Sequence, residues 1–252
     1  MMVHICMLRH RFHTNLYYLL IYLLTLLYSY KTPRNEVLVM KLKNMVNIIN
    51  GSTPSTSNPE FWGGDIKWIT PKDMSSIKTR YISYGNRNIT ELGYNSCSTT
   101  LVPKGTVLLT SRAPIGYVAI ADNSLCTNQG FKSMICNENL VKPMYLYYWL
   151  LKNREYLVSI AGGSTFKELS KEQLENVDIE LPNLEIQQHI VNTIGTVDNL
   201  IEKTLEILNS IKKLRRLLYK HFSLNSISTV PFKEIVTFEN GAQPPKSEHI
   251  YE

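Results

Sequence analysis

The stretch from Leu184 to Phe222 constrains this chain most, because it holds no proline and no cluster of turn residues, and Gly195 is its only glycine. Apolar residues recur along it at steps of three or four, which is the period of one helix face. A single helix of that length would span about 58 Å, and its narrow stripe needs a partner helix to cover it. We therefore predict a long coiled-coil-forming helix. Its partner-facing residues are Ile190, Ile194, Val197, Ile201, Leu205, Leu208, Ile211, Leu214, Leu218 and Phe222.

The region before this helix, residues 40–183, has the pattern of a strand-rich domain. Short β-branched or aromatic runs bounded by Gly, Pro, Asp and Ser predict strands at 65–70, 105–111 and 116–122. A helical apolar period predicts a helix over 142–160. A short helix and a strand at Val177–Leu181 follow, and Pro182 ends them. The expected fold class is α+β, a strand-rich domain followed by the long helix.

Residues 42–62 resemble the final segment of the chain, residues 232–252. The two align without a gap over thirteen positions, with identities at Lys43/Lys233, Val46/Val236, Asn50/Asn240, Gly51/Gly241 and Pro54/Pro244. Chance is one interpretation, since strand-then-turn segments look alike and Asn-Gly is a common turn pair. The interpretation we favour is a two-copy architecture, because the offset is about the size of a domain plus a connector. Only one copy is then complete in this chain.

The charge distribution is compatible with a polyanionic partner. The formal net charge is +6, and residues 60–167 carry twelve Lys and Arg against seven Asp and Glu, whereas 168–180 carry five acidic residues against one lysine. A basic body followed by an acidic edge suits a polyanion on one side, although an ordinary solvated surface has the same signature. The four cysteines lack CxxC spacing and histidine partners, which argues against zinc and a disulfide framework and fits the cytoplasm.

The apolar run at 16–30 leaves three interpretations open. It is shorter than the ~20 residues that span a bilayer, and no small-residue cleavage pattern follows it. A membrane anchor, a packed helix and an extension upstream of a natural start at Met40 all remain. The internal repeat favours the extension, because the second copy aligns only from about Met40 onward.

No sequence signature of a catalytic site is present. The chain has no Walker loop, HExxH or nucleophile elbow, and none of its six histidines lies within 40–183. Asn58–Phe61 resembles the adenine-holding motif of amino-methyltransferases but lacks its second proline, so it predicts a turn. Asp178 and Glu180 share a strand face, but no nearby lysine completes a nuclease triad. We therefore expect a non-catalytic chain that binds no metal and no cofactor itself.

The domain instead carries residues suited to nucleic acid. Basic side chains that can neutralise phosphates lie at Lys67, Lys72, Lys78, Arg80, Arg87, Arg112, Lys132 and Lys167. Asn128 and Gln129 can bond adenine edges, and Arg112 can bond guanine. Ser164 and Thr165, next to Gly-Gly, can offer hydroxyl and N–H groups to a phosphate. Each has a plainer interpretation, a solvated lysine or a turn over 128–130, but together they predict a DNA-binding face.

Four stretches together resemble a known family, the DNA specificity subunits of type I restriction–modification systems. They are WITPKDM at 68–74, GTVLLTSRAPIGYVAI at 105–120, TNQGFKSM at 127–134 and the run at 162–201. Leu-Pro followed by Leu184, Gln187, Ile190, Ile194, Asp198 and Ile201 is the most telling part. The resemblance implies a target recognition domain over 40–183, a conserved spacer helix over 184–222 and a second, truncated recognition domain from 223 to 252. Residues 1–39 lie outside it.

The resemblance also implies a function. Such subunits have two recognition domains that each read half of a split double-stranded DNA site, and conserved helices that set the spacing and dock methyltransferase subunits. Methylation with S-adenosylmethionine and ATP- and Mg²⁺-dependent cleavage belong to the methyltransferase and restriction partner subunits. The docking surface is then expected on the polar flank of the long helix, including Glu202, Lys212, Lys213 and Arg216.

Since the chain has only one such helix, we expect it to pair with a second copy in an antiparallel homodimer. Two identical recognition domains would then read a palindromic site with a spacer. The competing class is a membrane-anchored coiled-coil protein built on residues 16–30 and the long helix. It leaves the strand-rich middle of the chain unexplained.

Overall fold

The computed structural model describes residues 38–77, 79–163, 167–224 and 236–237. The predictions for the apolar run at 16–30, for Lys78, Ser164 and Thr165, and for most of 223–252 concern residues outside these ranges. Among the described residues, no helix combines the length and the apolar character that crossing a membrane requires.

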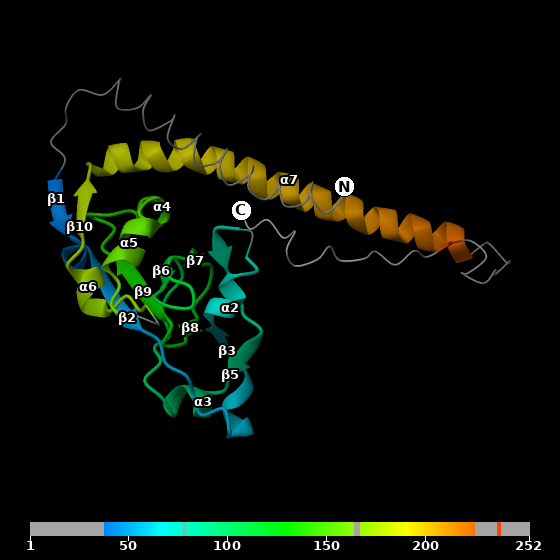
Figure 1. The fold of residues 1–252 in the computed structure, drawn as a ribbon, viewed down its shortest axis with the longest axis horizontal. Coiled ribbons are helices and arrows are strands. Elements are labelled where there is room, and N and C mark those ends of the chain that lie inside the picture. Colours follow the sequence, from blue (N-terminus) through cyan, green and yellow to red (C-terminus); the bar gives the residue numbers. More distant parts are fainter. Residues whose placement is uncertain (1–37, 78, 164–166, 225–235, 238–252) are drawn as a thin grey trace, which may run out of the picture. The chain divides into compact units, whose positions relative to one another are not determined.

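The domain is built around a five-stranded sheet of order β2-β9-β6-β7-β4 (Figure 1). Neighbouring strands are antiparallel, except that β4 runs parallel to β7. The strands of this sheet are β2 Val46–Asn50, β9 Phe131–Cys136, β6 Val107–Thr110, β7 Val118–Ala121 and β4 Tyr81–Ile82. The strand runs predicted at 105–111 and 116–122 are confirmed as β6 and β7.

Two smaller sheets complete the strand framework. One has the order β5-β3-β8, with β5 Arg87–Ile89, β3 Trp62–Ile69 and β8 Cys126–Thr127. The other pairs β1 Leu38–Lys41 with β10 Asp178–Leu181. The strand predicted at 65–70 is confirmed within β3, and that at Val177–Leu181 corresponds to β10. The antiparallel β1–β10 pair brings the start of the domain next to the residues that lead into the long helix.

Strand β6 is buried on both faces, which explains its sequence. Val107 and Leu109 belong to one hydrophobic cluster, whereas the intervening Leu108 packs with Phe131 in a second cluster. Side chains of a strand alternate between its two faces, so a strand covered on both sides needs a continuous apolar run. The five-stranded sheet therefore separates two cores.

The short helices of the domain are α2 Pro71–Met74, α3 Glu91–Asn95, α4 Pro143–Lys152, α5 Arg154–Ile160 and α6 Lys171–Glu175, with 3₁₀ turns η1 Leu42–Asn44 and η2 Pro59–Phe61. The prediction of one helix over 142–160 is wrong in detail, because Asn153 divides it into α4 and α5. The Asn153 Nδ2 group donates to the carbonyl of Trp149 at 2.8 Å, as its backbone N–H does at 3.0 Å. The Asn153 backbone has φ −99° and ψ 20°, which lies outside the helical region, so the helix ends there.

The predicted long helix is confirmed as α7, Leu184–Leu224. Asn183 begins it by accepting a hydrogen bond on Oδ1 from the Ile186 N–H at 2.9 Å. The described residues up to Glu202 form one compact unit, and those from Lys203 onward fall in a second. The compact unit thus extends past residue 183, where the sequence predicted the domain to end, because the first part of α7 packs on the domain.

This packing changes the role of the first part of the apolar stripe. Ile194 is buried in the main hydrophobic cluster, and Ile190 packs against that cluster. The prediction that these two residues face a partner helix is therefore corrected: they face their own domain. Further along the stripe, Leu208, Ile211 and Leu218 are exposed within the described residues.

Candidate nucleic-acid interface

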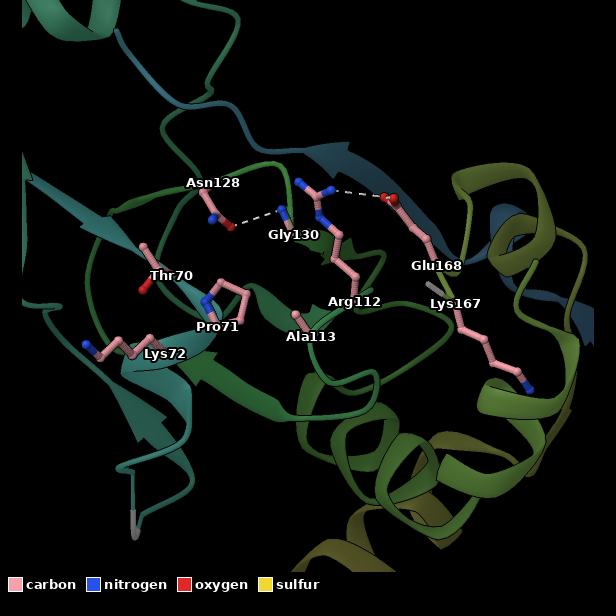
Figure 2. A pocket seen from close by; sticks show the side chains of 9 residues that line it. All are labelled: Thr70, Pro71, Lys72, Arg112, Ala113, Asn128, Gly130, Lys167 and Glu168. Carbon is pink, nitrogen blue, oxygen red and sulfur yellow. Dashed lines mark hydrogen bonds and ion pairs between the residues drawn. The ribbon is translucent and has the colours of Figure 1, made fainter. Parts of the chain in front are cut away.

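An open cleft of about 720 Å³ gathers four of the residues that the sequence predicted to bind DNA, Lys72, Arg112, Asn128 and Lys167. Its remaining lining residues are Thr70, Pro71, Ala113, Gly130 and Glu168. Figure 2 shows Thr70, Pro71 and Lys72 on one side and Arg112, Lys167 and Glu168 on the other. The lining residues come from four chain segments that lie far apart in the sequence.

Arg112 is presented by the tight connection between β6 and β7. The Thr110 hydroxyl donates to the Pro114 carbonyl at 2.7 Å and accepts from the Tyr117 N–H at 2.9 Å, which closes the loop. Ala113, at the tip, has a φ of 53° in the left-handed region that non-glycine residues seldom adopt. Such local strain concentrates at functional sites. The loop therefore defines the backbone position from which Arg112 enters the cleft.

Asn128 lies in the turn between β8 and β9. Its Oδ1 accepts from the Gly130 N–H at 2.9 Å, and its backbone N–H donates to the Ile69 carbonyl at 3.0 Å. Residues 128–130 are thus a turn, as the plainer interpretation had it, and they also line the cleft. The turn leaves the Asn128 amino group and a second lone pair on Oδ1 for other partners.

Gly51 allows the chain to pass directly over this turn. A Cβ at Gly51 would lie 2.1 Å from the Asn128 carbonyl oxygen and 2.2 Å from that of Thr127, so only glycine fits. The sequence suggested a turn for the Asn50-Gly51 pair. The structural reason for this glycine is instead the close approach of its backbone to that of Thr127 and Asn128.

Lys72 is positioned by a short capped helix, α2. Thr70 and Asp73 form a capping box, in which the Thr70 N–H donates to Asp73 Oδ2 at 2.8 Å. The other carboxylate oxygen, Asp73 Oδ1, accepts from the Asn86 N–H at 3.0 Å. The buried Asp73 therefore fixes α2 to the next segment, while Lys72 itself stays exposed.

One carboxylate lies among the cations of the cleft. Glu168 is 3.8 Å from Arg112 Nη1 and 4.0 Å from Lys132 Nζ. Lys132 lies on β9 and its side chain is only 7% exposed. Burial lowers the pKa of Lys132, and the Glu168 carboxylate partly offsets this effect. The cleft is cationic overall, and Glu168 moderates its charge.

Other predicted DNA-binding residues lie elsewhere. Arg80 is buried and hydrogen-bonds to α7, so its assignment to a solvent-facing DNA surface is corrected. Lys67 is half-buried on β3 and does not line the cleft. Gln129 is exposed, and its Oε1 accepts from the Thr53 hydroxyl. Arg87 stacks over the Trp62 ring at 3.5 Å. Thr165 lies outside the described residues.

Glu168 is the one charged lining residue of the cleft that was not predicted from the sequence. Glu168 belongs to the acidic run at 168–180, whose composition gave no sign that its first carboxylate enters the basic cleft. Ser111, next to Arg112, is fully buried and does not line the cleft, and its hydroxyl has no hydrogen-bond partner among the described residues. The cleft carries a single carboxylate beside its basic and amide groups, and nowhere in the described ranges do three or more His, Cys, Asp or Glu side chains gather to hold a metal ion.

Sequence comparison relates the chain to specificity subunits. A family model described as the type I restriction modification DNA specificity domain matches residues 34–213. The type I restriction enzyme MjaIX specificity subunit of Methanocaldococcus jannaschii is 48% identical over 198 residues, which cover 77% of this chain and 45% of that protein. The EcoR124I/EcoR124II specificity subunit of Escherichia coli is 27% identical over 179 residues, covering 68% and 43%. The chain spans less than half the length of these two relatives.

Solved structures show the same fold. The S subunit from M. genitalium superposes with a TM-score of 0.57 at 18% identity, covering 77% of this chain and 48% of that one. The HsdS subunit from Thermoanaerobacter tengcongensis gives a TM-score of 0.51 at 21% identity, covering 74% and 43%. With a family model that matches most of its length and a relative of nearly half identity, the chain belongs to the type I restriction modification DNA specificity domain family.

Proposed function

We propose that the chain is a sequence-specific DNA-binding subunit of a type I restriction–modification complex, and that its cleft reads one half of a split double-stranded site. The observation that carries the proposal is the convergence of Lys72, Arg112, Asn128 and Lys167 on one cleft. Each of the four has a side chain whose chemistry suits DNA, and the fold brings them together from four segments of the chain. Membership of a DNA specificity domain family supports DNA as the ligand of this cleft.

The four residues divide into two kinds of contact. The Arg112 guanidinium can donate two hydrogen bonds to O6 and N7 of guanine, and the Asn128 amide can pair with N6 and N7 of adenine. Lys72 and Lys167 are exposed ammonium groups suited to phosphates, which give affinity and register without sequence information. The cleft thus combines two residues that can contact bases, Arg112 and Asn128, with two exposed lysines that can contact phosphates. Sequence-specific binding uses both kinds of contact.

The chemistry of the system is assigned to partner chains. In this proposal the methyltransferase subunits methylate adenine with S-adenosylmethionine, and the restriction subunits cleave with ATP and Mg²⁺. The specificity subunit supplies only the DNA contact and a docking surface, for which we propose the polar flank of α7, including Lys212, Lys213 and Arg216. The sequence supports this division because it carries none of the signatures of those reactions.

We further propose that α7 pairs with the same helix of a second copy, running antiparallel. From Lys203 onward the helix exposes large apolar side chains, among them Ile207, Leu208, Ile211, Leu214, Leu217 and Leu218. A continuous apolar surface of this kind marks an interaction site. Two-fold pairing would place two identical recognition domains on one DNA and make the site a palindrome.

Selection from duplexes with a randomised central segment tests the DNA-reading function. The full chain should enrich a defined sequence, and fluorescence anisotropy then compares that sequence with a scrambled one. Arg112→Ala and Asn128→Ala should each weaken binding to the selected site by about 1–3 kcal/mol while changing binding to the scrambled site little.

Lys152→Ala is the matched control, because Lys152 is exposed on α4 and does not line the cleft. It should leave the selected sequence and its affinity unchanged. A folded chain that enriches no sequence, or an Arg112→Ala variant that weakens all duplexes equally, would contradict the proposal.

A further inference from the structure

Arg80 connects the recognition domain to α7 through a partly buried cluster of hydrogen bonds. Its Nε donates to Glu202 Oε1 at 3.1 Å, its Nη2 to Glu202 Oε2 at 2.9 Å, and its backbone N–H to Glu202 Oε1 at 2.9 Å. Nη2 also donates to Asn199 Oδ1. The Arg80 side chain is 9% exposed and that of Glu202 is 20% exposed. The pair combines a guanidinium fork with one carboxylate, a bidentate geometry that adds directional specificity to the charge attraction.

The helix is adapted to this contact along one face. Gly195, Asp198, Asn199 and Glu202 follow one another at helical spacing. Asp198 Oδ2 accepts from the Tyr148 hydroxyl at 2.6 Å and lies 3.9 Å from Arg80 Nε. A Cβ at Gly195 would lie 3.4 Å from Arg80 Nη1 and 3.7 Å from the Tyr148 hydroxyl. The only glycine of the helix therefore faces the guanidinium and the tyrosine, at a distance where a Cβ would make ordinary van der Waals contact.

The domain side of the contact is fixed as well. The Arg80 carbonyl accepts from the Ile120 N–H of β7 at 2.8 Å, so the backbone of Arg80 continues the central sheet. Tyr148 is held on α4, whose neighbouring side chains fill the main core. The guanidinium is thus attached to the same sheet whose β6–β7 loop presents Arg112.

A second anchor holds the start of the helix. Gln187 is fully buried, its Oε1 accepts from the Lys142 N–H at 2.9 Å, and its Nε2 donates to the Leu140 and Pro182 carbonyls at 2.9 Å each. Fifteen residues separate Gln187 from Glu202, which is about 22 Å along a helix. One anchor allows a helix to pivot, whereas two anchors separated by four turns fix its axis.

We propose that Arg80 is a positioning residue that fixes the orientation of the first part of α7, up to Glu202, on the recognition domain. The proposal rests on the proposed function, because a fixed first part of α7 gives the DNA-reading cleft a defined orientation relative to that part of the helix. Glu202 is the last residue of the compact unit, so the Arg80 contact lies where the helix leaves it. Arg80 does not line the cleft, so helix orientation and base reading are separable.

The test measures helix orientation without DNA. Spin labels attached through non-natural amino acids at the exposed positions Asn95, on α3, and Leu200, on α7, report a distance distribution in the full chain by pulsed dipolar spectroscopy. The wild-type chain should give one narrow distribution. Arg80→Met should broaden its width at least twofold at a temperature where circular dichroism shows an intact fold. Its affinity for a duplex with one half-site should stay within threefold of the wild-type value.

Matched variants separate positioning from general stability. Arg112→Met removes the same functional group from the cleft and should lose DNA affinity while keeping the narrow distribution. Glu202→Gln keeps the shape of the contact and should broaden the distribution less than Arg80→Met, and it decides the question if Arg80→Met does not fold. A distribution that stays narrow in every folded Arg80 and Glu202 variant overturns the proposal. A chain that shows the broadening but binds no DNA would support the positioning role and contradict the proposed function instead.

Discussion

Arg112 Nη1 lies 3.8 Å from Glu168 Oε2 inside the cleft, so the residue best suited to read guanine already faces a carboxylate of its own chain. The two side chains are 40% and 44% exposed, which places the pair at the border between protein and solvent. At that exposure an ion pair contributes little stability. Its effect on an incoming polyanion is the larger one, because the carboxylate repels the phosphates that the surrounding cations attract.

We predict that Glu168→Gln strengthens DNA binding and weakens discrimination. Removing one negative charge among cleft cations should raise affinity for scrambled duplexes by about 2- to 5-fold, corresponding to 0.5–1 kcal/mol for a partly exposed charge. The selected site should gain less, since Arg112 loses the partner that orients it. Glu172→Gln, the same change on exposed α6, is the control. Weaker binding to both duplexes by anisotropy would show that Glu168 contacts DNA directly.

Lys72 and Lys167 are predicted to act through phosphates. Lys72→Ala and Lys167→Ala should weaken the selected and scrambled duplexes alike, and each should reduce the slope of log affinity against log salt by about 0.9 per lost contact. Lys152→Ala should leave the slope unchanged. Anisotropy titrations at several salt concentrations measure it. A change of sequence preference without a change of slope would move these lysines to the base-reading group.

The secondary structure of this chain was largely readable from its sequence, since periodicity reports local geometry directly. The apolar period gave α7 to within two residues at its end, and the β-branched runs gave β6 and β7. The apolar period continues across Asn153, and the sequence does not show whether an asparagine lies inside a helix or ends it. Whether an asparagine amide turns back onto a helix carbonyl depends on packing that the local sequence does not contain.

The sequence predicted the residues of the cleft only in part, because it shows which residues are charged but not which of them are buried. Arg112 and Arg80 look alike in the sequence, yet one lies at a loop tip and the other is buried against α7. Likewise, Lys72 is exposed at the cleft, whereas Lys132 is buried on β9. Contacts between segments that lie far apart in the sequence decide whether a basic residue faces a ligand or stabilises the fold. The carboxylates opposite Arg80 lie more than a hundred residues away.

The contact between Arg80 and Glu202 should fail in acid. Burial favours a higher pKa for Glu202, but hydrogen bonds from Arg80 outweigh burial and leave the pKa below its ordinary value. A carboxylate with a lowered folded pKa contributes stability above its unfolded pKa of about 4.3, and this contribution is lost as pH falls through the folded pKa. Arg80 stays charged throughout this range.

We therefore predict that Glu202→Gln lowers the free energy of unfolding by about 1–2 kcal/mol at pH 7 and that the difference from wild type shrinks below about pH 4. Urea unfolding of the full chain at both pH values measures it, with Glu172→Gln as the control for charge alone. A difference that is constant from pH 7 to pH 3 would mean that the contact does not depend on ionised Glu202.

The exposed apolar part of α7 leads to the last prediction, the oligomeric state. Ile207, Ile211, Leu214 and Leu218 recur at alternating steps of four and three, the seam of a two-stranded coiled coil. Their exposed fractions lie between 48% and 60% in the single chain. Pairing with a second copy would cover this seam. The purified chain should therefore scatter light at micromolar concentration as a particle of twice its 29.0 kDa.

Two variants make the test specific. Ile211→Glu places a charge in the seam and should yield monomers, because burying an unpaired carboxylate against an apolar partner costs several kcal/mol. Asn209→Glu adds the same charge on the opposite side of the helix and should remain dimeric. If the wild-type chain is a monomer while circular dichroism shows the helix intact, the seam is covered by a different chain, and the palindromic site expected from two equal halves would not form. Dimers that survive Ile211→Glu would instead place the contact on another surface of the molecule.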